Sequence, residues 1–128
     1  MEVQPLPVDS SCRRLFCPEY FRDLLHIIAQ FYFWANFRKV SIMLEEIEME
    51  YEVHSINISK GEQKEPEFLK ISPNNKIPVI VDRDNGLSLM ESGVILQYLA
   101  RKSGQLMPEN DTDYWKMQEW LMFQMASV

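Results

Sequence analysis

Cysteine, basic residues and long hydrophobic runs are all scarce in this sequence, and each scarcity excludes a class of protein. The two cysteines, Cys12 and Cys17, are separated by four residues, so they do not form the Cys-x-x-Cys pair of thiol redox motifs. No further pair of His or Cys at zinc-ligand spacing accompanies them. We therefore expect two reduced thiols in a cytoplasmic protein, and no bound metal.

The charge balance and the longest apolar run argue against two kinds of partner. Lysine and arginine number 13 against 19 acidic residues, which gives a net charge of −6 without any basic stripe. Such a surface disfavours nucleic acid and anionic membranes. The run from Leu24 to Ala35 is interrupted by His26 and Gln30, and it is shorter than the ~20 residues that span a bilayer. The N-terminus also lacks the basic region of a secretory signal.

The middle of the sequence reads as one α/β domain, preceded by an irregular leader at residues 1–26. Apolar residues make up 46% of the chain, which suffices for a real core. A strand, helix and strand in succession predict a right-handed parallel unit, and Asn85-Gly86 predicts a hairpin because both residues tolerate positive φ. Periodicity predicts a strand at 27–34, a helix that Asn36 precedes, a strand at 51–58, a short helix at 66–71, strands at 77–81 and 87–90, and a helix at 92–102.

A last helix follows a linker, and its composition is unusual. It starts near Thr112, a candidate cap, and eight of the twelve residues from 114 to 125 are apolar and lie all round the helix. A helix of this kind is normally buried. We expect either that another chain covers it, as in a homodimer or with another helical partner, or that residues 105–128 begin a truncated helical domain.

Two motifs, NNKIPVIVD from Asn74 and ESGVILQYL from Glu91, carry a resemblance to a known family. At this spacing they resemble the N-terminal domain of bacterial glutathione S-transferases, most closely the nu-like subgroup, and the resemblance covers about residues 31–128. It implies a thioredoxin-like β-α-β-α-β-β-α domain at 27–104 with a four-stranded mixed sheet, plus one helix from an incomplete all-α domain. It also implies glutathione as a co-substrate, in thiol conjugation or in glutathione-dependent disulfide reduction.

The residues of these motifs explain part of such a site by themselves. Pro78 stands at the mouth of a predicted strand, where an X-Pro bond can be cis and no ladder donor is needed. A cis bond there frees the backbone of Ile77 to pair with an extended peptide. Glu91 and Ser92 stand at a helix start, where free N–H groups favour an anion and the carboxylate can hold an ammonium. The alternatives are a structural turn at Pro78 and a simple N-cap at Ser92.

The resemblance assigns a part of the ligand to each of these residues. It implies that Ile77, beside Pro78, pairs with the cysteinyl part, and that Glu91 and Ser92 hold the γ-glutamyl end. It also supports Lys76 as a partner for a carboxylate and Gln63 as a partner for the ligand backbone; without the resemblance, both read as surface residues.

The segment before the first helix departs from the subgroup. Where the subgroup usually shows Thr-Pro-Asn-Gly, this sequence has Trp34-Ala35-Asn36-Phe37. Asn36 keeps a donor for the glutathione sulfur, whose thiolate is the nucleophile, and is the candidate catalytic residue; it could equally be a helix N-cap. We expect this chain alone to have little transferase activity. The alternative is a non-catalytic transferase-like remnant or a protein-interaction module.

Overall fold

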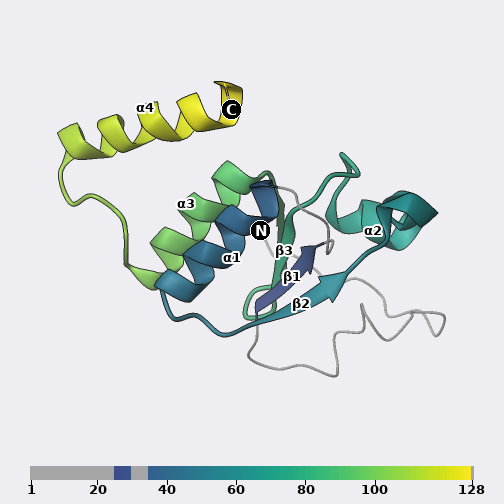
Figure 1. Ribbon diagram of the computed structural model, residues 1–128. Helices are drawn as coiled ribbons and strands as arrows, with labels where there is room; N and C mark the ends of the chain where they lie inside the picture. The colour runs from purple at the N-terminus through teal and green to yellow at the C-terminus, as the bar shows by residue number, and fades with distance from the viewer. Residues whose placement is uncertain (1–24, 30–34, 128) are drawn as a thin grey trace, which may run out of the picture.

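The computed structural model describes residues 25–29 and 35–127, and the strands among them form one sheet in the order β2-β1-β3-β4 (Figure 1). β1 pairs with β2 in parallel and with β3 antiparallel, and β4 completes an antiparallel hairpin with β3. The strands are β1 (Leu25–Ala29), β2 (Tyr51–Ser55), β3 (Val79–Asp82) and β4 (Leu87–Met90).

Four α-helices and two short 3-10 helices accompany this sheet in the described ranges. They are α1 (Ala35–Glu46), η2 (Ile58–Lys60), η3 (Glu62–Lys64), α2 (Pro66–Ile71), α3 (Ser92–Ser103) and α4 (Asp111–Ser127). The chain order β1-α1-β2, then α2, then β3-β4-α3 is that of the thioredoxin-like fold. No helix in the described ranges is both long and apolar enough to cross a membrane.

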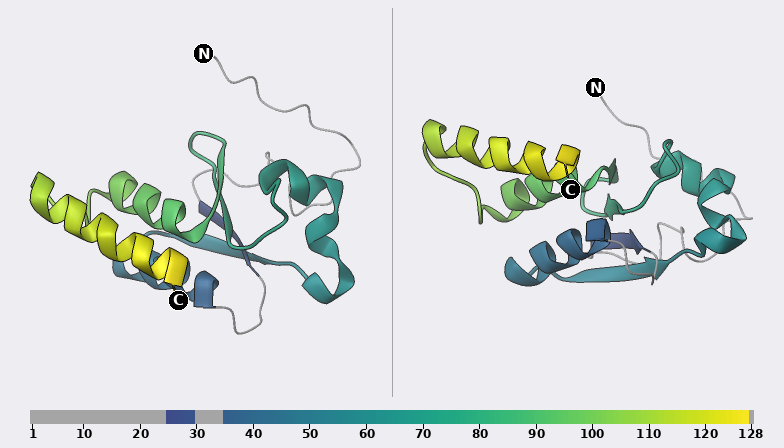
Figure 2. Two further views of the ribbon diagram at one scale, coloured as in Figure 1. Left: turned by 90° about the horizontal axis from the view of Figure 1, so that it is seen from above. Right: turned by 45° about the horizontal axis from the view of Figure 1, so that its top comes forward.

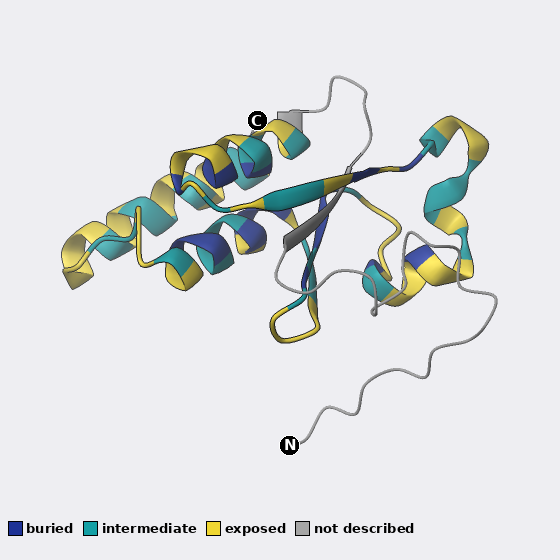
Figure 3. Cartoon of the chain, turned by 90° about the horizontal axis from the view of Figure 1, so that it is seen from below, coloured by how far each residue is buried: buried dark blue, intermediate teal, exposed yellow. Residues whose placement is uncertain are grey.

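Buried apolar residues occupy both faces of the sheet, because successive strand residues point to opposite sides. Ile80 of β3 packs with Leu44 of α1 and Leu99 of α3, all without exposed surface. The preceding residue, Val79, packs instead with Phe68 of α2. Figure 3 shows buried stretches in dark blue on helices and on the sheet. Thus α1 and α3 cover one face of the sheet, and α2 covers the other.

α4 lies alongside α3 on the side away from the sheet (Figure 2). Gln118 of α4 donates a hydrogen bond from its amide to Gln97 of α3 at 2.8 Å. As the sequence led us to expect, the chain itself does not bury α4 on every side: among the described residues, only the side toward α3 packs. Its exposed large apolar side chains are Trp115, Trp120, Met122 and Phe123.

Several strand boundaries differ from the predicted ones for local reasons. β1 begins at Leu25, so two residues assigned to the leader belong to the sheet; residues 1–24 and 30–34 lie outside the described residues. β2 ends at Ser55, because the side chain of Asn57 accepts the amide of Lys60 and starts η2. β3 begins at Val79 rather than at residue 77, directly after Pro78, which has no N–H to donate.

The end of α3, the hairpin and the start of α4 can also be compared with the sequence-based expectations. α3 ends at Ser103, one residue beyond the predicted end, and Gly104 follows as its C-cap with φ 70°, a conformation that glycine adopts without strain. The hairpin is confirmed, although of its Asn-Gly pair only Gly86 has positive φ. Asn110, not Thr112, caps α4, because its Oδ1 accepts the amide of Asp113 at 2.9 Å.

Candidate functional site

A cavity of about 230 Å³ lies where the starts of α1 and α3 meet the C-terminal part of α4. It brings the predicted site residue Asn36 together with two others from a distant part of the sequence, the neighbours Glu91 and Ser92. Both views of Figure 2 show the C-terminal end of α4 close to the start of α1. The other lining residues are Lys39, Gly93, Val94, Gln97, Met122, Gln124 and Met125.

Ser92 is the first residue of α3 and is buried. The N-cap alternative is wrong, because Glu91 holds that position and no side chain caps the helix. The Ser92 hydroxyl accepts a hydrogen bond from Lys39 Nζ at 3.4 Å and lies 3.7 Å from Met125 Sδ. The first N–H groups of a helix have no intrahelical partner. The start of α3 therefore combines a hydroxyl with free donors, which suits an anion.

Glu91 stands at the mouth of the cavity in an unusual backbone conformation. Its φ of 71° and ψ of 112° lie in a region that favours glycine, where another residue costs about 1–3 kcal/mol. The side chain is exposed, and its carboxylate accepts a hydrogen bond from Asn74 Nδ2 at 3.5 Å. A strained position that keeps an acid beside a cavity is typical of a functional residue.

The loop before β3 adjoins this site without lining the cavity. The bond from Asn74 to Glu91 ties the loop to the start of α3. The Ile77–Pro78 peptide bond is cis. Pro78 is buried, Ile77 is half-buried and Lys76 is exposed. The three predicted loop residues thus do not share the cavity wall with Asn36 and Ser92, and the loop reaches Glu91 through Asn74.

Gln63 lies in η3 and does not line the cavity. Its side-chain Oε1 is buried and accepts no hydrogen bond from any residue that the structure describes. Buried acceptors without a partner are rare in native proteins and call for an explanation. The structure therefore does not bring Gln63 together with the other predicted residues, but it leaves its amide incompletely bonded.

Asn36 lies inside the first turn of α1, so the alternative that it caps this helix is wrong. It is exposed and faces the same cavity as Lys39, three residues further along α1. The sequence reasoning missed Lys39, although residues three apart share one helix face. The ammonium of Lys39 donates to Gln124 Oε1 at 2.6 Å, and partial burial lowers the pKa of this lysine.

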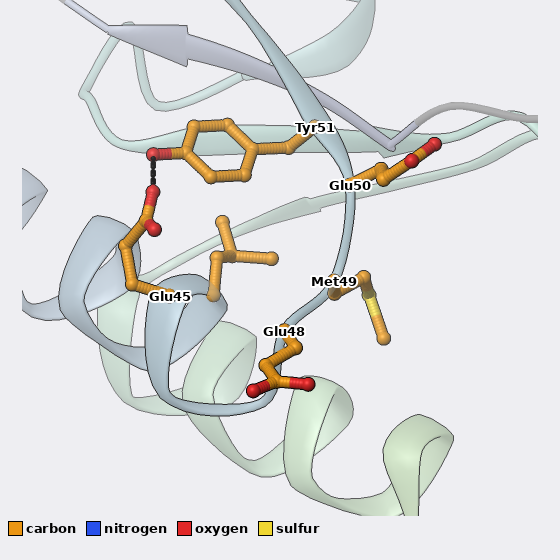
Figure 4. A pocket seen from close by; sticks show the side chains of 6 residues that line it. Glu45, Glu48, Met49, Glu50 and Tyr51 are labelled. Carbon is orange, nitrogen blue, oxygen red and sulfur yellow. Dashed lines mark hydrogen bonds between the residues drawn. The ribbon is translucent and has the colours of Figure 1, made fainter.

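A larger hollow of about 610 Å³ lies at the corner between α1 and β2 and carries none of the predicted residues (Figure 4). Three acids line it, Glu45, Glu48 and Glu50, and Tyr51 donates to Glu45 Oε1 at 2.6 Å. That hydrogen bond, with burial and the glutamate charge, raises the pKa of Tyr51. In the described part of the chain, no three His, Cys, Asp or Glu side chains could together hold a metal ion.

Residues 29–101 match the family of the glutathione S-transferase N-terminal domain. This match covers more than half of the chain, and it agrees with the fold and with the two motifs at the start of β3 and of α3. The chain therefore belongs to the glutathione S-transferase family.

The chain spans about half the length of the curated relatives that it matches. The disulfide-bond oxidoreductase YfcG of Escherichia coli strain K12 is 44% identical over 98 residues, which are 73% of this chain and 46% of YfcG. Glutathione S-transferase 1 of Schizosaccharomyces pombe is 36% identical over 107 residues, 76% of this chain and 47% of that enzyme. A glutathione transferase of Pseudomonas putida, solved with glutathione disulfide bound, superposes with a TM-score of 0.78 at 43% identity, covering 85% of this chain and 48% of that one.

Proposed function

We propose that the chain is the glutathione-binding part of a glutathione S-transferase, and that the γ-glutamyl end of glutathione occupies the cavity at the start of α3. The observation that carries this proposal is the cavity wall itself, to which α1 contributes Asn36 and the start of α3 contributes Glu91 and Ser92. A γ-glutamyl headgroup has one ammonium and one carboxylate, which match the acid and the helix start. The Pseudomonas relative with bound glutathione disulfide supports the proposal.

The rest of the ligand extends along the loop before β3. In this proposal the backbone of Ile77, beside Pro78, pairs with the cysteinyl part, and Lys76 pairs with a ligand carboxylate. Gln63 bonds the ligand backbone, which is supported by its incompletely bonded amide. We further propose that residues 27–104 are the glutathione-binding domain, that residues 105–128 are a linker and the first helix of a helical domain, and that the protein works in the reducing cytoplasm.

The chemistry that follows is that of an activated thiol. Asn36 donates a hydrogen bond to the glutathione sulfur, which favours the thiolate over the thiol. In conjugation, the thiolate attacks an electrophilic carbon, a carbon–sulfur bond forms and the leaving group departs with its electron pair. In disulfide reduction, it attacks one sulfur and expels the other as a thiolate; a second glutathione then resolves the mixed disulfide and forms glutathione disulfide. The name of the Escherichia coli relative favours the second reaction.

Calorimetric titration with reduced glutathione tests the binding proposal. We expect saturable binding that weakens about tenfold or more in Ser92→Ala and in Glu91→Gln. The first variant removes a hydrogen bond to the ligand carboxylate, and the second removes the negative charge that faces the ligand ammonium. Ser59→Ala and Glu109→Gln are matched controls at exposed positions outside the site, and they should bind as the unchanged chain does. Absence of binding by the unchanged chain, or equal affinity in all four variants, contradicts the proposal.

Turnover is a separate question, because the chain spans about half the length of the relatives it matches. We expect conjugation of glutathione to a chloronitrobenzene to be slow. We expect the same of glutathione-dependent reduction of a small disulfide. Both rates are measured beside a full-length relative. A rate close to that of the relative would refute this expectation and leave the binding proposal intact.

A second candidate, a non-catalytic interaction module, is favoured by the exposed apolar side of α4. Trp115 and Trp120 are 63% and 69% exposed. In this candidate a second copy of the chain covers that side of α4, since apolar surface of this kind marks interfaces. Sedimentation equilibrium should then show a dimer that Trp120→Lys dissociates, with tryptophans shielded from a soluble quencher. A monomer with freely quenched tryptophans counts against it.

A further inference from the structure

Unlike a typical surface lysine, Lys39 is partly buried and has only neutral hydrogen-bond partners among the described residues. Its side chain is half-buried in the cavity wall, and its two hydrogen-bond partners are both neutral: Gln124 Oε1 at 2.6 Å and Ser92 Oγ at 3.4 Å. No carboxylate within the described ranges lies within ion-pair distance of its ammonium. Removing a charge from water without an opposite charge nearby is unfavourable, so the position calls for an anion.

The donors of Lys39 leave room for such an anion. An ammonium has three N–H donors, and the two neutral partners take two of them. The remaining donor and the hydroxyl of Ser92 belong to the same cavity, at the free N–H groups of the start of α3. An added carboxylate therefore needs no displacement of Gln124.

A residue of opposite charge also lines the cavity. Glu91 lines the cavity together with Lys39, so an acid and a base border one space of about 230 Å³. A ligand group with an ammonium and a carboxylate on one carbon can satisfy both. A ligand with a single charge leaves one of the two groups without an opposite charge, and an uncharged ligand leaves both.

We propose that Lys39 is the residue that binds the α-carboxylate of the γ-glutamyl headgroup, paired with Glu91, which binds its α-ammonium. The proposal rests on the function proposed above and adds the residue that selects for the carboxylate. Gln124 is a positioning residue, because its short hydrogen bond fixes the ammonium next to Ser92.

The packing of α4 against α3 positions the ammonium of Lys39 through Gln124. Gly93 permits it, since a Cβ at this position would lie only 2.9 Å from Met125 Sδ. The close approach of α4 to α3 places Gln124 within reach of Lys39. The carboxylate subsite is thus built from α1 and α3, and α4 holds its cation in place.

Two glutathione analogues separate the roles of the charges. In 4-aminobutanoyl-Cys-Gly the α-carboxylate is missing, and in glutaryl-Cys-Gly the α-ammonium is missing. For the unchanged full chain we expect both analogues to bind about 10- to 100-fold more weakly than glutathione. In Lys39→Met, glutathione and glutaryl-Cys-Gly should lose about 10- to 100-fold, whereas 4-aminobutanoyl-Cys-Gly should bind as it does to the unchanged chain. Glu91→Gln should show the reverse selectivity.

The comparison of ligands within one variant makes the test robust to partial unfolding. Lys60→Met, at an exposed position outside the cavity, is the matched control and should keep the unchanged pattern. Lys39→Gln replaces Lys39→Met if the latter does not fold. If the unchanged chain binds glutathione and the Lys39 variant keeps the full preference for glutathione over 4-aminobutanoyl-Cys-Gly, the role of Lys39 is refuted and the proposed function stands. If the unchanged chain does not bind glutathione, the proposed function fails first.

Discussion

Asp82 is a carboxylate with only 1% of its surface exposed, and three groups hold it in its ionised form. It accepts hydrogen bonds from the Tyr98 hydroxyl, the Lys102 ammonium and the amide of Asp84. Burial alone would raise the pKa of Asp82, but these bonds and the charge of Lys102 outweigh it and hold the pKa below its usual range. The charge of Asp82 is therefore part of the folded structure of the β3-β4-α3 unit.

Asp82→Asn should destabilise the protein by about 3 kcal/mol, because it leaves buried partners without their charged acceptor. The measurement is the free energy of unfolding in urea at pH 7. Asp84→Asn is the matched control, since Asp84 accepts from the same Lys102 at 2.6 Å but has 59% of its side chain exposed. The control should lose well under 1 kcal/mol. Similar losses for both variants would contradict this assignment.

The stability contributed by Asp82 should depend on pH on the acid side only. Its pKa is lower in the folded chain than in the unfolded one, so the contribution is fully present above the unfolded value of about 3.9. It is lost as the pH falls through the folded pKa. Urea titrations below pH 4 should therefore show stability falling with pH less steeply in Asp82→Asn than in the unchanged chain. Parallel pH profiles would contradict the prediction.

Sequence reasoning found single residues where a local pattern indicates a role. Glu91 and Ser92 could be placed at a helix start because a hairpin and an apolar period precede and follow them, and they do line one cavity with Asn36. Lys39 and Gln124 could not be found in this way. A lysine or glutamine on a helix reads as solvated surface until the packing of α1 against α4 is known.

At the scale of one element, Asn110 caps the N-terminus of α4. Asn110 accepts the amide of Asp113 at 2.9 Å, and its own amide donates to Asp113 Oδ2 at 2.7 Å. Asn110→Ala should therefore cost about 1 kcal/mol of helix stability. Circular dichroism during thermal unfolding should show early loss of helix signal in this variant. Thr112→Ala, at the position that the sequence suggested as the cap, should leave the curve unchanged; an effect of equal size there would reverse the assignment.

The elements themselves were more predictable than their ends. The periods of α3 and of the β3-β4 hairpin are local properties of the sequence, and both elements form where they were expected. The end of β2 depends on a side chain of the following turn, Asn57, which competes with strand pairing. The composition of α4 predicted a helix that needs a cover from outside this stretch of chain, and much of its apolar surface is indeed exposed. What covers it could not be predicted, because no pattern within α4 specifies what lies opposite.

For the whole molecule, the two apolar clusters share one sheet and should unfold together. Leu99 of α3 has no exposed surface and belongs to one buried cluster with residues of α1 and β3. Leu99→Ala should lower the free energy of unfolding by about 2–5 kcal/mol. Fluorescence and circular dichroism should still report a single shared transition for the sheet. Leu106→Ala, at a leucine that is 61% exposed, is the control and should change stability by less than about 0.5 kcal/mol. Separate transitions for the two faces would contradict the prediction.

The sparse attachment of α4 gives the molecule a built-in reporter. Side-chain hydrogen bonds tie α4 to α1 and α3 through Gln118 and Gln124, while much of its apolar surface faces outward. Segments with few buried contacts open at low free energy, so amide hydrogens of α4 should exchange with deuterium long before those of α3. A ligand held by Lys39 would strengthen only the attachment at the C-terminal end. Deuterium uptake in the last turns of α4, compared with its first turn, therefore reports cavity occupancy without any label.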